Sequence, residues 1–411
     1  VDSLLGACSE HGFEVQTLFH PIVKTEQDAR SLIQIHLPEL TESEQEALRA
    51  EAVTTLQDVA MATDDYVAMR QRMATEIIRL ETSKHVSERY KDEAVEFLKW
   101  LSNEHFVFLG VRDYTFKTSA EGVVLPEEPD MVEGSNLGLM RDEDRNVLNR
   151  GAEPLLLTEE IGSFLSEPES LILAKATLVS RVHRRVNCDY VGVKHYGEGG
   201  KVIGETRFLG LYTAESYNQS IRSIPLLRRR VERVIKLAGA VPGTHNEKAL
   251  SNIMETWPRD EIIQTKSERL APIMKGALHL IGRPRVRLFV RPDRFNRFVS
   301  AAVFVPREAY DTTLRQRIAE TLEKAWNGTL VSFQPSFDGA SLVRVLFQIA
   351  LPANAPQPDI VKLEAEIAGL ARTWNDRFRS AIMDSPLSKE ERSLATMFTG
   401  GFNAAYREAF T

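Results

Sequence analysis

The feature that most restricts the fold is a series of five apolar segments between residues 285 and 351, four with the pattern of strands and one with the pattern of a helix. Two predicted strands flank a turn at Pro292-Asp293, a helix follows and ends at Asn327-Gly328, and two more strands complete the series. The elements are strands at Arg285 to Arg291 and Phe298 to Val305, a helix from about Asp311 to Trp326, and strands at Thr329 to Phe333 and Leu342 to Leu351. The order ββαββ predicts an α+β sandwich.

The first 65 residues show a related pattern. A helix is predicted at 1–8, and the segments 13–19 and 31–37 alternate as strands. Thr41 and Glu44 have the spacing of a capping box and begin the next helix. The order helix, strand, strand, helix is that of a ferredoxin-like unit without its first strand. We expect that strand to precede this segment, and therefore expect the chain to begin inside a longer protein.

The middle of the chain predicts a third sheet. Strands are expected at 106–111, 171–179, 186–196 and 201–212, with a helix near Glu159 to Leu165. The two last strands are joined by a short Gly-rich turn, so they form an antiparallel hairpin. This meander predicts a small antiparallel sheet with one packed face, of the PAS kind.

Composition excludes several classes of protein. The 411 residues carry a net charge of -7, so the protein as a whole is not suited to bind polyanions. Only two cysteines are present, which favours a reducing, cytoplasmic compartment over a disulfide framework. The apolar runs are far shorter than the ~20 residues that a membrane-spanning helix needs. We expect a soluble protein with about three domains at roughly 150 residues each.

The sequence motifs do not predict catalysis by this chain. Gly197 to Lys201 has neither the spacing of a phosphate-binding loop nor a helix after it, so a hairpin turn is the better interpretation. A Gly-x-Gly-x-x-Gly fingerprint does not follow any predicted strand, and the histidines and cysteines lack metal-site spacing. Cys188, within a strand, is interpreted as a buried structural thiol. We therefore predict neither a metal nor a cofactor site.

The start of the chain is the candidate effector site. Asp2 and Ser3 open a helix, whose outward amides can hold the carboxylate of an amino acid. Gly12 then permits a tight turn into the next strand. The alternative is that these residues only cap the helix.

Two arginine-rich stretches are candidate interfaces. Arg228, Arg229 and Arg230 lie together on a predicted helix, and Arg285 and Arg287 alternate with apolar residues, so that both project from one face of a strand. Three interpretations stay open: a solvated face with intramolecular ion pairs, a subunit or domain interface, and nucleic-acid binding. The acidic total charge weighs against nucleic acid.

Several ordered strings resemble the large bacterial NAD-specific glutamate dehydrogenases. The strings are Phe208-Leu209-Gly210-Leu211-Tyr212-Thr213, Ile224-Pro225-Leu226-Leu227-Arg228-Arg229-Arg230-Val231, His245-Asn246-Glu247-Lys248-Ala249-Leu250, Glu255-Thr256-Trp257-Pro258-Arg259-Asp260-Glu261 and Arg283-Pro284-Arg285-Val286-Arg287-Leu288-Phe289-Val290-Arg291. The resemblance runs from Val1 to Thr411 and implies the region that precedes the catalytic domain. It implies an α+β chain of ACT-like (ferredoxin-like) sandwiches and a PAS-like antiparallel sheet, joined by helical segments.

With this resemblance, six regions are expected. They are an ACT-like domain lacking its first strand at 1–65, a helical connector at 66–104, a PAS-like sheet domain at 105–220, a helical connector at 221–282, a second ACT-like domain at 283–352 and a helical segment at 353–411 that leads toward a catalytic domain outside this sequence.

The resemblance also implies a function. Family members convert glutamate, water and NAD to 2-oxoglutarate, ammonia and NADH, and no catalytic residue carries over to this chain. This chain is then expected to be an inactive regulatory and oligomerisation region. Its expected partners are its own catalytic domain, further subunits of a homotetramer and an amino-acid effector. The alternative is a stand-alone nucleic-acid-binding or adaptor protein that uses its arginine-rich helix and strands.

Overall fold

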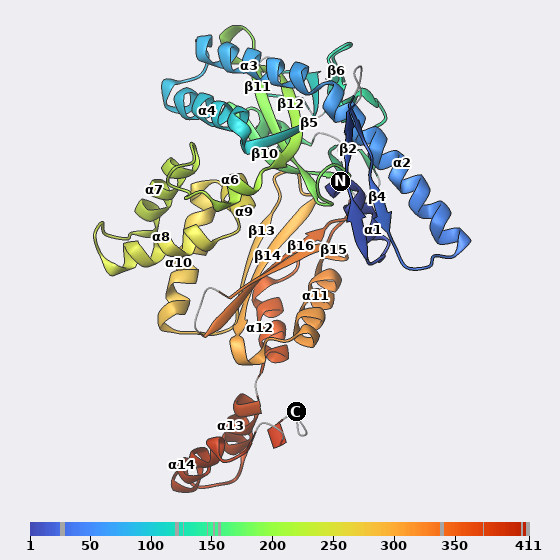
Figure 1. Ribbon diagram of the computed structural model, residues 1–411. Coiled ribbons are helices and arrows are strands. Elements are labelled where there is room, and N and C mark those ends of the chain that lie inside the picture. The colour runs from blue at the N-terminus through green and yellow to red at the C-terminus, as the bar shows by residue number, and fades with distance from the viewer. Residues whose placement is uncertain are drawn as a thin grey trace. The chain divides into compact units, whose positions relative to one another are not determined.

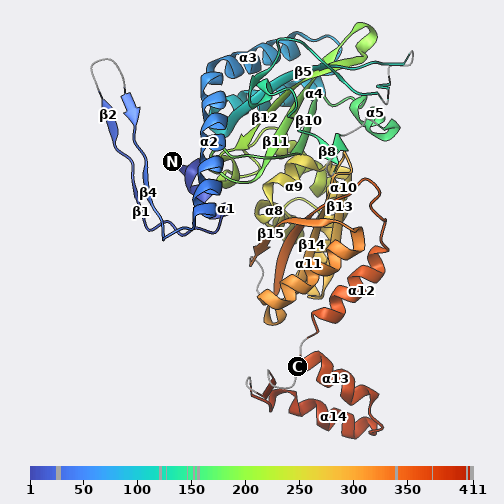
Figure 2. The ribbon, with the colours of Figure 1, turned by 90° about the vertical axis from the view of Figure 1, so that its right-hand side faces the viewer.

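The computed structural model describes residues 1–24, 29–119, 123–125, 127–145, 147–150, 153–154, 158–337, 341–372, 374–403 and 406–407. The chain divides into two compact units (Figures 1 and 2). Unit 1 comprises Val1–Leu237 and Trp257–Leu270, and unit 2 comprises Ala238–Thr256 and Ala271–Thr411. In the described residues, no helix is long and apolar enough to cross a membrane.

Unit 1 begins with a short helix, a long arm and three further helices. Its first elements are α1 (Asp2–Glu10), β1 (Thr17–Phe19), β2 (Ile22–Lys24), β3 (Ala29–Ser31), β4 (Gln34–His36), α2 (Glu42–Asp64), α3 (Tyr66–Thr82) and α4 (Glu88–Trp100). β1 pairs with β4 and β2 with β3, both antiparallel, and the two ladders form an arm that extends away from α2 (Figure 2). The predicted capping box is present, because Thr41 accepts from the Glu44 amide and Glu44 accepts from the Thr41 amide.

The structure of the arm does not confirm the ACT-like sandwich that was predicted for residues 1–65. Among the described residues, β1 and β4 form a two-stranded sheet of their own, and so do β2 and β3. Apolar residues on the arm stay exposed, as Phe19 at 54% and Leu32 at 58% show. Two strands were predicted, at 13–19 and 31–37, but the described residues of the arm form four shorter ones, and alternation could not say whether a helix would cover either face.

The main sheet of unit 1 confirms the predicted meander. Its strand order is β10-β11-β12-β5-β6, and β7 also pairs with β5. Its elements are β5 (Phe106–Thr115), β6 (Asp130–Met131), β7 (Leu137–Gly138), α5 (Glu159–Leu165), β10 (Leu171–Val179), β11 (Asn187–Tyr196) and β12 (Val202–Tyr212), with a separate pair β8 (Asn149–Arg150) and β9 (Glu153–Pro154). The turn at Gly197–Lys201 joins β11 to β12, as predicted for a hairpin. The sheet is antiparallel, and its PAS-like character stays a prediction.

Helices follow the sheet, and prolines and glycines separate them as predicted. They are α6 (Ala214–Asn218), α7 (Leu227–Ala238), α8 (His245–Thr256), α9 (Arg259–Gln264) and α10 (Ser267–Gly282). Pro242-Gly243 lies between α7 and α8, and Trp257-Pro258 lies between α8 and α9. Proline lacks the amide proton that a helix interior requires, so these positions end one helix before the next begins.

Unit 2 confirms the order ββαββ. Its elements are β13 (Arg287–Pro292), β14 (Phe298–Pro306), α11 (Thr312–Trp326), β15 (Thr329–Ser336) and β16 (Leu342–Ala350), followed by α12 (Ile360–Leu370), α13 (Trp374–Asp384) and α14 (Lys389–Met397). The sheet order is β13-β14-β16-β15, and all three pairings are antiparallel. Asp311 caps α11 by accepting from the Leu314 amide, and Asn327 ends it with left-handed backbone.

The core of unit 2 joins both helices to the sheet. Val303, Val345 and Phe347 from the strands pack with Ile318 of α11 and Ile367 of α12. Burial of such side chains stabilises the fold by about 1.5–3 kcal/mol each. α12 therefore belongs to this core, although the sequence analysis placed its residues in the following helical segment.

Candidate functional site

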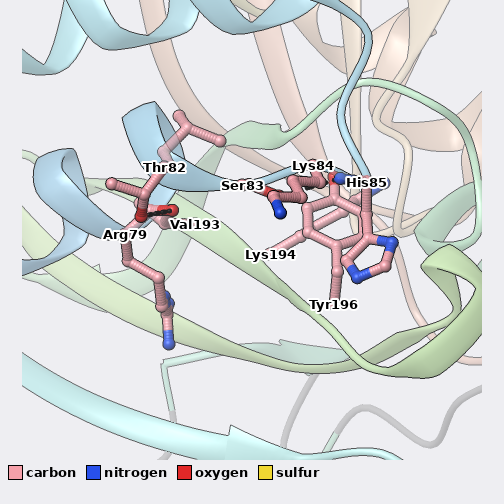
Figure 3. Close-up of a pocket in the computed structure, with 9 residues that line it drawn as sticks. Arg79, Thr82, Ser83, Lys84, His85, Val193, Lys194 and Tyr196 are labelled. Carbon is pink, nitrogen blue, oxygen red and sulfur yellow. Dashed lines mark hydrogen bonds between the residues drawn. The ribbon is translucent and has the colours of Figure 1, made fainter.

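A pocket of about 320 Å³ opens in unit 1 between the end of α3, the loop that follows it and β11 (Figure 3). Leu80 and Val193, both buried, provide apolar walls. The remaining lining residues are polar or charged: Arg79, Thr82, Ser83, Lys84, His85, Lys194 and Tyr196. The pocket thus combines an apolar floor with basic groups, which is a composition suited to a small organic ligand.

A buried carboxylate lies beside this pocket. Glu76 of α3 forms ion pairs with Arg72 and Arg79, and it accepts a hydrogen bond from the Thr206 hydroxyl at 3.0 Å. The same hydroxyl lies 2.8 Å from an Asp113 oxygen, so its single proton is shared between the two carboxylates, and Arg72 pairs with Asp113. Burial lowers the pKa of Arg79, and the charge of Glu76 offsets this only in part. This network fixes α3 on β5 and β12, and thereby fixes one wall of the pocket.

Lys194 and Tyr196 come from the end of β11. Lys194 is only 3% exposed, and its Nζ donates to the Glu167 carbonyl at 2.8 Å. The Tyr196 hydroxyl is buried and makes no hydrogen bond within the described part of the chain. Burial, together with the charge of Glu169, raises the pKa of Tyr196 above its usual value, so the hydroxyl is protonated at neutral pH. Buried hydroxyls normally have a partner, so a ligand atom is a candidate for that role.

The predicted effector residues lie elsewhere in unit 1. Asp2 is the first residue of α1 and is exposed, while the Ser3 hydroxyl accepts from the His183 amide at 3.0 Å. Gly12 has φ +74°, a backbone conformation that favours glycine and fits the predicted tight turn. The contact of Ser3 favours a structural role, and an effector site at these three residues stays a proposal.

The arginines on α7 make contacts within unit 1. Arg228 donates to both Glu93 and Glu96, and Arg229 pairs with Glu93 at 2.9 Å. Arg230 donates to the carbonyls of Ile262 and Ile263, both at 2.5 Å. These contacts match the interpretation as intramolecular ion pairs, and they leave an interface role for α7 as a proposal.

The other two predicted arginines line a groove in unit 2. Arg285 and Arg287 lie with Arg283, His245 and His279 around a cavity of about 750 Å³ between α8, the end of α10 and the start of β13. Arg287 forms an ion pair with Glu364 at 2.7 Å, whereas Arg285 is exposed. Arg285 lies before β13, which begins at Arg287, so the predicted strand began two residues too early and only Arg287 projects from it. The sequence did identify a basic surface, although it could not show that helices form the opposite wall.

The described residues contain no group of three His, Cys, Asp or Glu side chains able to hold a metal ion. Cys188 is fully buried, as predicted, and burial raises its pKa to about 12. The sequence analysis did not identify the pocket residues Arg79, Lys84 and Tyr196. Arg79 and Tyr196 are 117 positions apart (196 minus 79), and no local sequence pattern joins them.

Comparison with known proteins agrees with this architecture. Residues 287–375 match the glutamate dehydrogenase ACT2 domain, and residues 224–283 match glutamate dehydrogenase helical motif 1. The NAD-specific glutamate dehydrogenase of Halomonas elongata is 34% identical over 372 residues, which are 90% of this chain and 23% of that protein. The enzyme of the same name from Pseudomonas aeruginosa is 28% identical over 434 residues, covering 100% of this chain and 26% of the relative. The Mycobacterium tuberculosis enzyme is 25% identical over 382 residues, 90% of this chain and 22% of the relative.

These matches define a mixed helix and antiparallel-sheet chain that contains an ACT domain and a helical motif of glutamate dehydrogenases. The chain belongs to the large NAD-specific glutamate dehydrogenase family. It spans about a quarter of the length of the curated relatives that it matches.

Proposed function

We propose that this chain is a non-catalytic regulatory and oligomerisation region of an NAD-specific glutamate dehydrogenase. The observation that carries the proposal is the strand arrangement. Each strand pairing in the described residues is antiparallel. The nucleotide-binding fold of dehydrogenases requires a parallel sheet with a phosphate-binding turn at its carboxyl edge. Hydride transfer with NAD is therefore assigned to residues of the parent enzyme outside this chain.

The regulatory part of the proposal rests on the ACT match and the pocket of unit 1. The ACT2 match covers β13 to α12, a small sheet with two helices on its core. The pocket adds a ligand-sized cavity in the other unit, at a place where sheet and helix side chains are fixed by buried ion pairs. Binding there would stabilise one arrangement of α3 on its sheet and so shift the population of conformations.

The assembly part rests on the unit 2 groove. Arg283 and Arg285 are exposed, so their charges are available to an acidic surface of another subunit or of the catalytic domain. Such complementary charges guide association and set its register more than they raise affinity. We propose that the parent protein is a cytoplasmic homo-oligomer, with four subunits as the first assembly to test.

The test compares the purified chain with the complete gene product. Glutamate and NAD should yield NADH only with the complete product, and the chain alone should be inactive. Light scattering should show the chain as an oligomer that Arg285→Glu dissociates, while Arg228→Gln, which changes an internal ion pair, leaves the oligomer intact. Glutamate-dependent NADH formation by the chain alone would refute the non-catalytic assignment, and a monomeric wild-type chain would refute the assembly role.

A further inference from the structure

We propose that the pocket between α3 and β11 binds a small aliphatic dicarboxylate. This inference rests on the proposed regulatory function and names the class of its ligand. The evidence is the charge of the lining residues, the buried hydroxyl of Tyr196 and the apolar floor, each taken in turn below.

The lining residues are strongly biased toward positive charge. Arg79, Lys84 and Lys194 are cationic, and the nine residues around the pocket include no Asp or Glu. Of these cations, Arg79 is already paired with Glu76, which also pairs with Arg72. Glu169, whose charge acts on Tyr196, lies 3.1 Å from Lys266. Lys84 has no ion-pair partner in the part of the chain that the structure describes. An anionic ligand would supply the missing negative charge.

Tyr196 adds a specific donor. Its hydroxyl is shielded from water and makes no hydrogen bond in the described residues. A phenol that is protonated at neutral pH can donate to a carboxylate oxygen, which is the acceptor that the cationic lining also favours. Figure 3 places Tyr196 with His85, Lys84 and Lys194 on the same side of the pocket.

The apolar walls distinguish among anions. Leu80 and Val193 are 3% and 1% exposed and would contact the body of a ligand. Inorganic phosphate offers oxygens in every direction and would leave some of them against these walls without a donor. A dicarboxylate places its methylene groups on the walls and its charges at the ends. A cavity of about 320 Å³ accommodates a chain of this size.

The carboxyl end of α3 is the feature that opposes an anion, because helix carbonyls carry partial negative charge. Two of the last carbonyls, those of Arg79 and Leu80, have hydrogen-bond donors near them. The Thr82 hydroxyl donates to the carbonyls of Ile78 and Arg79 at 2.9 and 3.3 Å, and the Ser83 amide donates to Leu80 at 3.2 Å. The full charges of Lys84 and Lys194 therefore outweigh the remaining dipole.

Calorimetric titration of the full chain with succinate, glutarate, L-aspartate and inorganic phosphate tests the proposal. Succinate or glutarate should bind. Inorganic phosphate should bind with a dissociation constant at least about tenfold larger, which is a difference of about 1.4 kcal/mol in binding free energy. L-aspartate separates a requirement for two carboxylates from a requirement for an ammonium group. If only L-aspartate binds, the ligand is a zwitterion and the dicarboxylate assignment is overturned.

Three variants locate the site. Lys84→Glu should weaken succinate binding by about tenfold or more, and Lys236→Glu, an equal charge change at an exposed position of α7, should leave it within about twofold. Tyr196→Phe should weaken binding while its thermal stability stays equal to wild type or rises, because the removed hydroxyl has no partner. A loss of stability without a loss of affinity would show that Tyr196 is structural and would overturn its role.

The result is separable from the proposed function. Absence of heat with every ligand would overturn the pocket assignment, whereas oligomerisation and NADH formation are measured without any dicarboxylate. Equal weakening by Lys84→Glu and Lys236→Glu would show a general field effect and would also overturn it.

Discussion

The Nε of Arg297 donates to Oδ2 of Asp293 over 2.9 Å, across the turn that joins β13 to β14. The side chains of these two residues are 0% and 6% exposed, so the ion pair is buried. Asp293 also accepts from the Phe295 amide at 3.2 Å, and the guanidinium lies 5.0 Å from the Phe295 ring. One carboxylate therefore fixes both the backbone of the turn and the position of a buried cation.

Replacing Asp293 by Ala should lower the free energy of unfolding of unit 2 by about 3–5 kcal/mol, because a buried cation loses its counter-charge. Urea denaturation followed by circular dichroism measures the change. The control is Lys362→Gln, which removes the exposed partner of Asp359 at 3.9 Å and should cost less than about 1 kcal/mol. Equal effects of the two substitutions would show that the turn does not depend on its buried pair.

Gly138 should tolerate alanine less well than Gly134 does. Both have positive φ, +59° and +75°, but a Cβ at Gly138 would lie 2.3 Å from the Leu109 carbonyl oxygen, whereas one at Gly134 meets nothing within 4 Å. We expect Gly134→Ala to cost about 1 kcal/mol from the backbone conformation, and Gly138→Ala to cost at least about 2 kcal/mol more from the steric overlap. Thermal unfolding of both variants provides the comparison.

The capping box at Thr41 should contribute measurably to the stability of α2. Thr41→Ala removes the acceptor for the Glu44 amide and should cost about 1 kcal/mol. Thr54→Ala, on the same helix, removes only a hydroxyl that donates to the Ala50 carbonyl, and should be neutral or slightly stabilising. A Thr41→Ala protein as stable as Thr54→Ala would contradict the cap.

The same box predicts a pH dependence with a defined sign. Hydrogen bonds from the Thr41 hydroxyl and amide lower the pKa of Glu44. A carboxylate with a lowered folded-state pKa contributes stability that is present above its unfolded value, about 4.3, and is lost as the pH falls through the folded value. The difference in stability between wild type and Thr41→Ala should therefore shrink on acidification below about pH 4.

Both thiols should be unreactive in the native chain. Cys188 is 0% exposed with its pKa raised to about 12, and burial also raises the pKa of Cys8. Because the thiolate is the reactive form, a thiol reagent at pH 8 should react slowly with the folded protein. In denaturant, the reagent should titrate two thiols at once. Rapid reaction of one thiol in the native protein would place it at an accessible surface.

The parts of the fold that local signals determine were predictable. Asp311 and Asn327 bound α11 within one residue of the prediction, because a capping carboxylate and a left-handed asparagine act through their own backbone neighbours. The mostly apolar run Leu171–Val179 likewise located β10.

Long-range relationships were not predictable from one sequence. Arg228 and Glu93 are 135 positions apart, and Arg287 and Glu364 are 77 apart, so no periodicity joins them. For the same reason the arginine stretches were identified as basic, while their internal partners were not. Tyr196 belongs to this class too, because its importance comes from an unpaired hydroxyl, which only packing reveals.

The arm of unit 1 is expected to open more readily than the rest of the unit. Its ladders hold only a few residue pairs each, such as Leu18 with Ile35, and two-stranded hairpins are marginally stable in water. The amides of β1 and β4 should then exchange with solvent long before those of β11, and shielding of the arm would slow them. Hydrogen exchange at these few positions would therefore report when the arm becomes buried against another polypeptide.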